Sequence, residues 1–294
     1  MEAKATTMPA EWVQWIQTCY DQQTDFVKMQ QILLEQFDAA LVEQWIQHIW
    51  HSAPPPENTV YDSEFSWMPR DLTSVDDVRV EYLNLKPVVA VLHNVLTQAE
   101  CAEIIAHYRQ HPDIARATVH SHEAHADGKH NVISDARTNS LMALGYNSHP
   151  LVVKLEHTLA KVTTVPVSQG ESPQLLYYTQ GQQYTPHDDF FHDRSAGTHI
   201  AQHGQRIATV ITYLNTVPVG GGTGFPNLDI TVPAVAGTAV YFEYTDPTGA
   251  STTQCRHAGL PVAVGEKWAI TKWLRLRNTM PAETARLYQE EQQP

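Results

Sequence analysis

A histidine and an aspartate separated by one residue occur three times in the chain, and each pair could bind a metal ion. The pairs are His111 with Asp113, His125 with Asp127, and His187 with Asp189. Because the chain holds 16 histidines, roughly one such match is expected by chance. The surrounding sequence must therefore distinguish the three pairs.

His187 differs from the other two histidines because it follows a β-rich run and is flanked by aromatic residues. On an extended segment, side chains two residues apart project to the same face, so His187 and Asp189 converge on one ion. Asp188 then points away from it. His111 stands before a proline at the end of a predicted helix, and His125 lies in a polar loop. We therefore predict that His187 and Asp189 bind the metal.

A second imidazole from another strand would complete a face of two histidines and one carboxylate. That set leaves adjacent coordination positions open and is diagnostic of non-haem Fe(II) oxygenases. We predict His257 for this ligand, because it stands just before a turn and the β-like segment 267–276. His192, His199 and His203 compete, but they lie in a polar connection, where solvated loop residues are more common.

The composition indicates a soluble globular protein with one large domain and an appendage. The 294 residues are 42% hydrophobic and 17% charged, and the three cysteines are too scattered for a disulfide framework, which fits a reducing compartment. No apolar run approaches the roughly 18 residues of a membrane span, and no secretory signal is present. We expect a cytoplasmic protein without a membrane partner. The net charge of -13 argues against binding nucleic acid.

Segments with different patterns predict the domain organisation. Apolar residues three and four apart in 10–50 predict helices that pack on the main domain, or else form a groove for a partner. Three successive prolines at 54–56 interrupt any helix. We predict a helical N-terminal region at 1–52, a linker at 53–80, the main domain at 81–278 and a C-terminal tail at 279–294.

Within the main domain, a strand is predicted at 88–92 and a helix begins at Thr97, which forms a capping-box pair with Glu100. Another helix is predicted at 150–162. Short β-rich runs follow at 174–178, 207–214, 230–232, 238–244 and 268–276. Because glycine, proline and asparagine turns rather than helices separate these runs, we expect antiparallel strands in a sandwich or barrel.

Several ordered blocks resemble the prolyl 4-hydroxylase branch of the Fe(II)/2-oxoglutarate dioxygenases. The blocks lie at 178–193, 204–215, 220–226, 257–262 and 265–275. The resemblance implies a mainly β fold: a double-stranded β-helix, or jelly-roll barrel, with supporting helices. It also implies Fe(II) and O2, with 2-oxoglutarate as co-substrate and ascorbate as a further candidate cofactor.

The resemblance assigns roles to individual residues. It implies that His187, Asp189 and His257 ligate the catalytic iron, that Lys267 binds a carboxylate of 2-oxoglutarate, and that Tyr178 hydrogen-bonds the same molecule. The role of Lys267 is physically reasonable, because a lysine in an apolar pocket is costly when unpaired and the co-substrate supplies its partner.

Three further residues, Tyr184, Arg206 and Trp273, match family positions that shape a peptidyl-proline site. The resemblance therefore implies hydroxylation of a prolyl residue in a protein or peptide. Gly222 replaces an acidic residue common in the family, and Asn139 replaces a serine in a block that begins at Arg137. These departures leave two alternatives: the same chemistry on a free amino acid or small molecule, and a barrel that only binds a partner.

Overall fold

The computed structural model describes residues 72–120, 131–191, 197–245 and 251–281, together with 33–34, 37, 41–42, 284–285 and 288. The chain groups into two compact units, 1–59 with 192–195, and 60–191 with 196–294. The predicted N-terminal helices lie almost wholly outside the described residues, so they and the domain limits stay predictions. All the elements below belong to the second unit.

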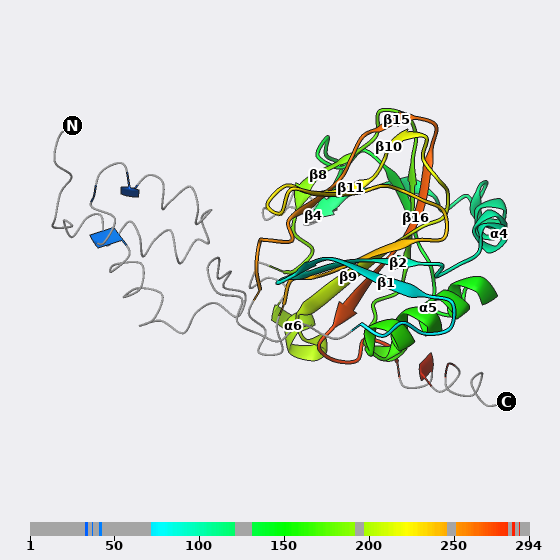
Figure 1. Cartoon of the computed structure of the whole chain (residues 1–294), viewed down its shortest axis with the longest axis horizontal. Coiled ribbons are helices and arrows are strands. Elements are labelled where there is room, and N and C mark those ends of the chain that lie inside the picture. Colours follow the sequence, from blue (N-terminus) through cyan, green and yellow to red (C-terminus); the bar gives the residue numbers. More distant parts are fainter. Residues whose placement is uncertain are drawn as a thin grey trace. The chain divides into compact units, whose positions relative to one another are not determined.

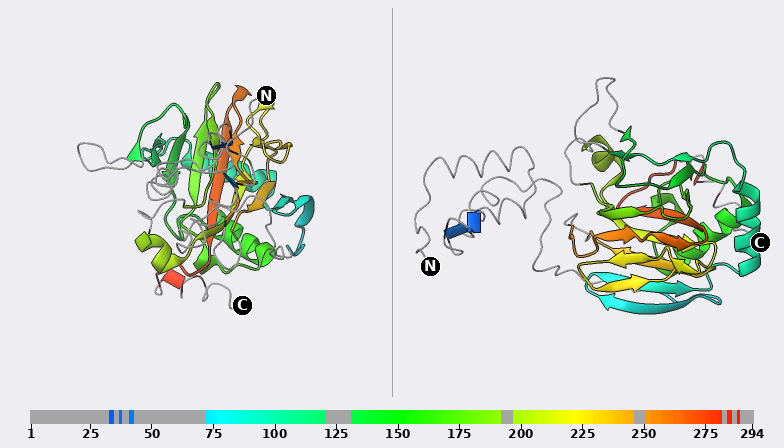
Figure 2. Two further views of the ribbon diagram at one scale, coloured as in Figure 1. Left: turned by 90° about the vertical axis from the view of Figure 1, so that its left-hand side faces the viewer. Right: turned by 90° about the horizontal axis from the view of Figure 1, so that it is seen from above.

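The second unit contains an eight-stranded antiparallel sheet (Figures 1 and 2). Its central strands are β9 and β16, and every residue of β16 is buried. In spatial order the strands are β1 (Arg79–Leu85), β2 (Val88–His93), β13 (Ala239–Glu243), β9 (Arg206–Tyr213), β16 (Lys267–Arg275), β7 (Gln174–Tyr178), β6 (Ser140–Ala143) and β3 (Ala115–Arg116).

A second sheet has four strands, β12 (Ile230–Val232), β11 (Thr223–Phe225), β14 (His257–Gly259) and β8 (Tyr184–His187). One buried apolar cluster joins the two sheets: Tyr213 and Phe242 of the large sheet pack with Phe225 and Val232 of the small one. Two sheets around one core form the predicted jelly-roll barrel. The remaining strands pair as β10 (Val219–Gly220) with β15 (Val262–Val264), and β4 (Val119–His120) with β5 (Asn131–Val132).

Helices cover the outer face of the large sheet. Ile104 of α4 (Gln98–Tyr108) and Leu155 of α5 (Pro150–Thr163) share a second buried cluster with Val210 of β9. Because successive strand residues face opposite sides, β9 and β16 each supply apolar side chains to both clusters. This explains why their sequences lack the alternation of apolar and polar residues that a strand with one exposed face shows. No helix among the described residues is long and apolar enough to cross a membrane.

One predicted loop contains a short helix. α6 spans Gly197–His203, within the segment that we expected to be a polar connection. It ends at Gly204, which has a φ of 71° and donates its amide to the Ile200 oxygen at 2.7 Å. A glycine in this left-handed conformation commonly ends a helix. The polar composition hid the helix, but Gly204 was a usable signal.

The predicted capping box at the start of α4 is confirmed. The Glu100 amide donates to the Thr97 hydroxyl at 3.2 Å, and the Thr97 amide donates to the Glu100 carboxylate at 2.8 Å. Thr97→Ala is expected to lower the free energy of unfolding by about 1 kcal/mol, since it leaves a helix amide without its cap. Urea denaturation measures this change. Thr158→Ala within α5 is the matched control and should be neutral or stabilising, because alanine favours a helix interior.

Candidate metal centre

Strand pairing brings the two predicted histidine ligands together. His187 ends β8 and His257 begins β14, and the antiparallel register of these strands places the two residues directly opposite each other. Their ring centroids lie 4.3 Å apart. Residues far apart in sequence thus reach one ion because they are cross-strand neighbours.

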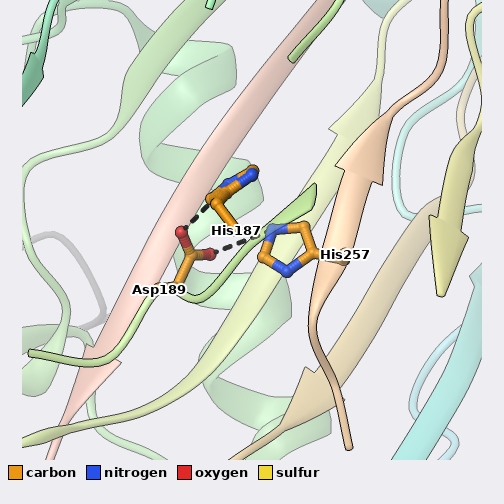
Figure 3. Close-up of side chains that lie close together, drawn as sticks. All are labelled: His187, Asp189 and His257. Carbon is orange, nitrogen blue, oxygen red and sulfur yellow. Dashed lines mark ion pairs between the residues drawn. The ribbon is translucent and has the colours of Figure 1, made fainter. Parts of the chain in front are cut away.

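Asp189 lies beside both rings (Figure 3). Its Oδ1 is 3.6 Å from His187 Nε2 and its Oδ2 is 3.5 Å from His257 Nε2. The ligand atoms of the three residues lie within 4.8 Å of one another, and no other such group occurs among the described residues. Asp188 faces elsewhere, as predicted, because its carboxylate accepts from Arg256 at 3.0 Å.

Main-chain oxygens orient both imidazoles. His187 Nδ1 lies 2.9 Å from the Thr185 oxygen, and His257 Nδ1 lies 3.2 Å from the Cys255 oxygen. A carbonyl oxygen only accepts, so each Nδ1 donates to it, and in the neutral ring Nε2 is then the nitrogen that can bind a cation. A ligating histidine usually has its other ring nitrogen held in this way.

The electrostatics keep two of the ligands ready for a cation at neutral pH. Burial lowers the pKa of His257 to about 4, so its ring is neutral. Burial alone would raise the pKa of Asp189, but His257, His187 and Arg206 together hold it well below its usual range. Metal ligands must be deprotonated. Two imidazoles and one carboxylate occupy one face of a metal ion and leave its other coordination positions open, so this ligand set fits Fe(II).

A buried lysine lies on the large sheet of the same barrel. Lys267 begins β16 opposite Tyr178 of β7, and only 2% of it is exposed. Its Nζ lies 5.0 Å from the centroid of the Tyr178 ring and 5.3 Å from that of Tyr213. No described carboxylate forms an ion pair with it, and burial lowers its pKa to about 7. A buried cation without a partner is costly, so this lysine is well placed to bind an anionic ligand.

Tyr178 connects the lysine to the metal ligands. Burial raises its pKa to about 12, so its hydroxyl keeps its proton and can donate a hydrogen bond. A Cβ at Gly259 would lie 3.3 Å from this hydroxyl. Gly259 is two residues beyond His257, and its lack of a side chain leaves room for the tyrosine.

The three residues predicted to shape a substrate site lie around the metal ligands. The Tyr184 ring stacks on His187, with centroids 3.5 Å apart at 14°. The Arg206 guanidinium lies 4.0 Å from the Trp273 ring centroid and donates to the main-chain oxygen of Asp189 at 3.0 Å. The structure therefore brings together all eight residues predicted for the site.

Sequence reasoning missed the residues that support this group. Glu171 accepts from Arg206 at 2.7 Å and from Arg275 at 2.7 Å, so one carboxylate holds two arginines. The Arg137 guanidinium lies 4.7 Å from the Tyr184 ring centroid and is held by Asn139. No spacing along the chain predicts the Glu171 contacts, whereas the resemblance marked the block at Arg137 without giving it a contact.

Comparison with known proteins decides the family. Residues 173–275, which contain the whole predicted metal set, match the model of the 2OG-Fe(II) oxygenase superfamily. Prolyl 4-hydroxylase 1 of Arabidopsis thaliana is 33% identical over 242 residues, which cover 76% of this chain and 82% of that protein. The chain belongs to the 2OG-Fe(II) oxygenase superfamily. This 2OG-Fe(II) oxygenase is accordingly a 2-oxoglutarate-dependent dioxygenase that uses Fe(II), 2-oxoglutarate and O2.

Other relatives agree with this assignment. Prolyl 4-hydroxylase subunit alpha-1 of Rattus norvegicus is 34% identical over 198 residues, covering 65% of this oxygenase and 35% of that protein. The solved viral collagen prolyl hydroxylase of Paramecium Bursaria Chlorella virus-1, in its 2OG complex, has a TM-score of 0.50 and 23% identity, and covers 64% of this oxygenase and 95% of that chain. The latter supports the fold. The family recognised from the ordered blocks is confirmed.

Proposed function

We propose that this 2OG-Fe(II) oxygenase hydroxylates a prolyl residue in a protein or peptide. One atom of O2 enters the prolyl ring, and the other enters the succinate that forms from 2-oxoglutarate with loss of CO2. The observation that carries the proposal is that His187, Asp189 and His257 share a barrel with the buried Lys267, which pairs with no carboxylate among the described residues. Relatives named prolyl 4-hydroxylases supply the substrate class.

In this proposal the Nε2 atoms of His187 and His257 and a carboxylate oxygen of Asp189 would hold Fe(II). Bound iron supplies the site where O2 is activated and a C–H bond is oxidised. The protein keeps both rings oriented through the main-chain oxygens described above. The buried surroundings of Asp189 and His257 exclude water from that side.

Lys267 and Tyr178 anchor 2-oxoglutarate in the same proposal. The lysine ammonium pairs with one carboxylate of the co-substrate, and the protonated Tyr178 hydroxyl donates a hydrogen bond to it. Both groups are fixed before binding, because they are cross-strand partners in the large sheet. A rigid anchor holds the rest of the co-substrate at a constant distance from the metal ligands.

Tyr184, Trp273 and Arg206 form the proposed walls for the proline ring. Tyr184 touches the ligand His187, and Arg206 touches the main chain of the ligand Asp189. A substrate held by these walls would lie beside the metal. We also propose that residues 81–278 are the catalytic domain and that the reaction occurs in the cytoplasm, which the buried free thiols of Cys101 and Cys255 support.

The decisive assay pairs substrates that differ only at proline. The iron-loaded protein is incubated with 2-oxoglutarate and a set of proline-containing peptides, and with the same peptides carrying alanine instead. Succinate formation should rise only with the proline peptides, each of which should gain one oxygen atom by mass spectrometry. Equal turnover of free proline would favour a small-molecule substrate. Binding of metal and 2-oxoglutarate with no turnover on any peptide would leave only a binding role.

A Tyr184 variant tests the proposed substrate wall. Tyr184→Leu should lower kcat/KM for the peptide by about 5-fold, because an aromatic contact contributes about 1 kcal/mol beyond its buried area. The KM for 2-oxoglutarate should stay unchanged. Tyr82→Leu, on the exposed edge strand β1, is the matched control and should leave both constants unchanged. If Tyr184→Leu changes only metal affinity, the ring supports His187 and does not form the wall.

A further inference from the structure

A threonine hydroxyl contacts the carboxylate of the metal set. Thr209 Oγ1 donates to Asp189 Oδ2 at 2.6 Å, and Thr209 itself is fully buried. Thr209 lies in the central strand β9, directly opposite Phe242 on one side and Trp273 on the other. The donor therefore lies in a central strand that is paired on both sides, whereas Asp189 lies beyond the end of β8.

A tyrosine hydroxyl forms a second hydrogen bond to the Thr209 hydroxyl. The Tyr244 hydroxyl lies 2.9 Å from the same Thr209 oxygen. A threonine hydroxyl has a single proton, and here that proton is given to Asp189, so Tyr244 must donate to Thr209. The two bonds thus run in one direction, from Tyr244 through Thr209 to Asp189.

Aromatic packing fixes the tyrosine that begins this chain of bonds. The Tyr244 ring centroid lies 6.0 Å from that of Phe190 and 5.9 Å from that of Phe242. Phe190 follows Asp189 in the chain, and the Phe242 ring lies 4.4 Å from His257. The tyrosine is also 1% exposed. It therefore has little freedom to turn its hydroxyl elsewhere.

We propose that Tyr244 and Thr209 are positioning residues of the metal centre, and that their directed hydrogen bonds set the rotation of the Asp189 carboxylate. The proposal rests on the metal role of His187, Asp189 and His257 given above. Neither residue belongs to the proposed metal ligands or to the proposed substrate walls. Their effect is on which carboxylate oxygen faces the ion.

The orientation matters because a carboxylate can bind a metal through one oxygen or through both. A second bound oxygen would take a coordination position that the co-substrate or O2 needs. The bond from Thr209 occupies Oδ2 and leaves Oδ1 as the better ligand. We call the two hydrogen bonds from Tyr244 through Thr209 to Asp189 the relay. The relay therefore favours metal binding through one carboxylate oxygen and leaves the remaining coordination positions to the co-substrate and O2.

The first test substitutes Thr209, with Mn(II) as a redox-stable probe. Titration calorimetry of the metal-free protein should show that Thr209→Val binds Mn(II) about 10- to 100-fold more weakly, the usual effect of losing a partner of a ligand. Thr209→Ser keeps the hydroxyl and should restore most of the affinity. The Mn(II) electron paramagnetic resonance spectrum should change in Thr209→Val and return in Thr209→Ser.

The same strand offers a matched control. Thr212 of β9 is fully buried like Thr209, but its hydroxyl has no hydrogen-bond partner among the described residues. Thr212→Val is the same chemical change and should leave Mn(II) affinity unchanged. A loss of affinity in Thr212→Val equal to that in Thr209→Val would show that the effect comes from strand packing, and would overturn the proposal.

Tyr244→Phe tests the direction of the relay. The variant should weaken Mn(II) binding by about 2- to 10-fold, the range expected for one neutral hydrogen bond. In a Thr209→Val background the same change should have no effect, because the connection to Asp189 is already broken. Additive losses would contradict the relay, as would unchanged affinity in both single variants. If the unmodified protein bound no Mn(II), the metal centre itself would fail.

Discussion

His257→Ala is expected to reduce metal-dependent turnover of 2-oxoglutarate by more than about 100-fold. Loss of a partner outside the ligand set already costs roughly 10- to 100-fold, and His257 is proposed as a ligand itself. The substitution also leaves the Asp189 carboxylate with one imidazole neighbour in place of two. Metal content after anaerobic loading with Fe(II), measured by atomic emission, should fall in parallel with succinate formation.

His149→Ala is the matched control for this prediction. His149 is a buried histidine like His257, but its Nδ1 accepts from the Leu151 amide at the start of α5. The variant should lower the free energy of unfolding by about 1 kcal/mol through loss of a helix cap. It should keep its metal content. Full metal binding and turnover in His257→Ala would overturn the assignment of the centre.

Lys267→Met is expected to weaken 2-oxoglutarate binding and stabilise the protein at the same time. Removing one partner of a buried charge pair costs roughly 2–5 kcal/mol, so affinity should fall by at least about 30-fold. The protein without 2-oxoglutarate gains stability, because the lysine is 2% exposed and no described carboxylate pairs with it. Replacing a buried ion pair with well-packed apolar groups is often neutral or stabilising by about 1–4 kcal/mol, so removing the buried Lys267 cation should raise the free energy of unfolding by a similar amount. Calorimetric titration and denaturation measure the two effects.

Lys272 provides a control of opposite sign on the same strand. It is buried, but it pairs with the buried Glu156 of α5. Lys272→Met should destabilise the protein by about 3–5 kcal/mol, because it leaves the buried Glu156 carboxylate, among the described residues, with no cationic partner and only the hydrogen bond from the Tyr288 hydroxyl. Binding of 2-oxoglutarate should change little in any Lys272→Met protein that folds. If Lys267→Met also destabilised the protein, Lys267 would have an anionic partner in the folded chain, and the prediction would be wrong.

The pH dependence of Lys267 has a definite sign. The unfolded lysine takes up its proton below a pKa of 10.5, whereas the buried lysine does so only below about 7. Between these values the unfolded state holds more protons, so the contribution of Lys267 to stability rises with pH. A bound carboxylate favours the charged lysine. Binding of 2-oxoglutarate above pH 7 should therefore take up a proton, which calorimetry in two buffers of different ionisation enthalpy detects.

The sequence predicted the strands whose pattern is strong. The observed ends of β7, β9, β13 and β16 lie within one residue of those expected, because each is a β-rich run bounded by turn residues. The strands that carry the metal ligands are shorter. β8 has 4 residues and β14 has 3, too few to show a period. His187 and His257 were found from their chemistry and context, and their register follows only from the folded sheet.

The supporting residues could not be predicted for a different reason. Thr209 and Thr212 stand in the same apolar run, and both are buried. Only the alternation of faces makes one a partner of Asp189 and leaves the other without a bond. The sequence does not say which face of a doubly buried strand meets the barrel interior. Glu171 is similar, since its two arginines come from distant parts of the chain.

The alternation of faces along β16 has a further consequence. The strand carries two pairs of a lysine and a tryptophan: Lys267 and Trp273 lie on the face of the metal centre, and Trp268 and Lys272 on the face of the helices. A slip of one residue would exchange the pairs, because the side-chain period is two. The barrel interior would still contain one lysine and one tryptophan, but these would be Lys272 and Trp268, at positions where they cannot replace Lys267 and Trp273. Glu156 would lose its charge partner in the same step, so an error of register would damage the co-substrate anchor and the packing together.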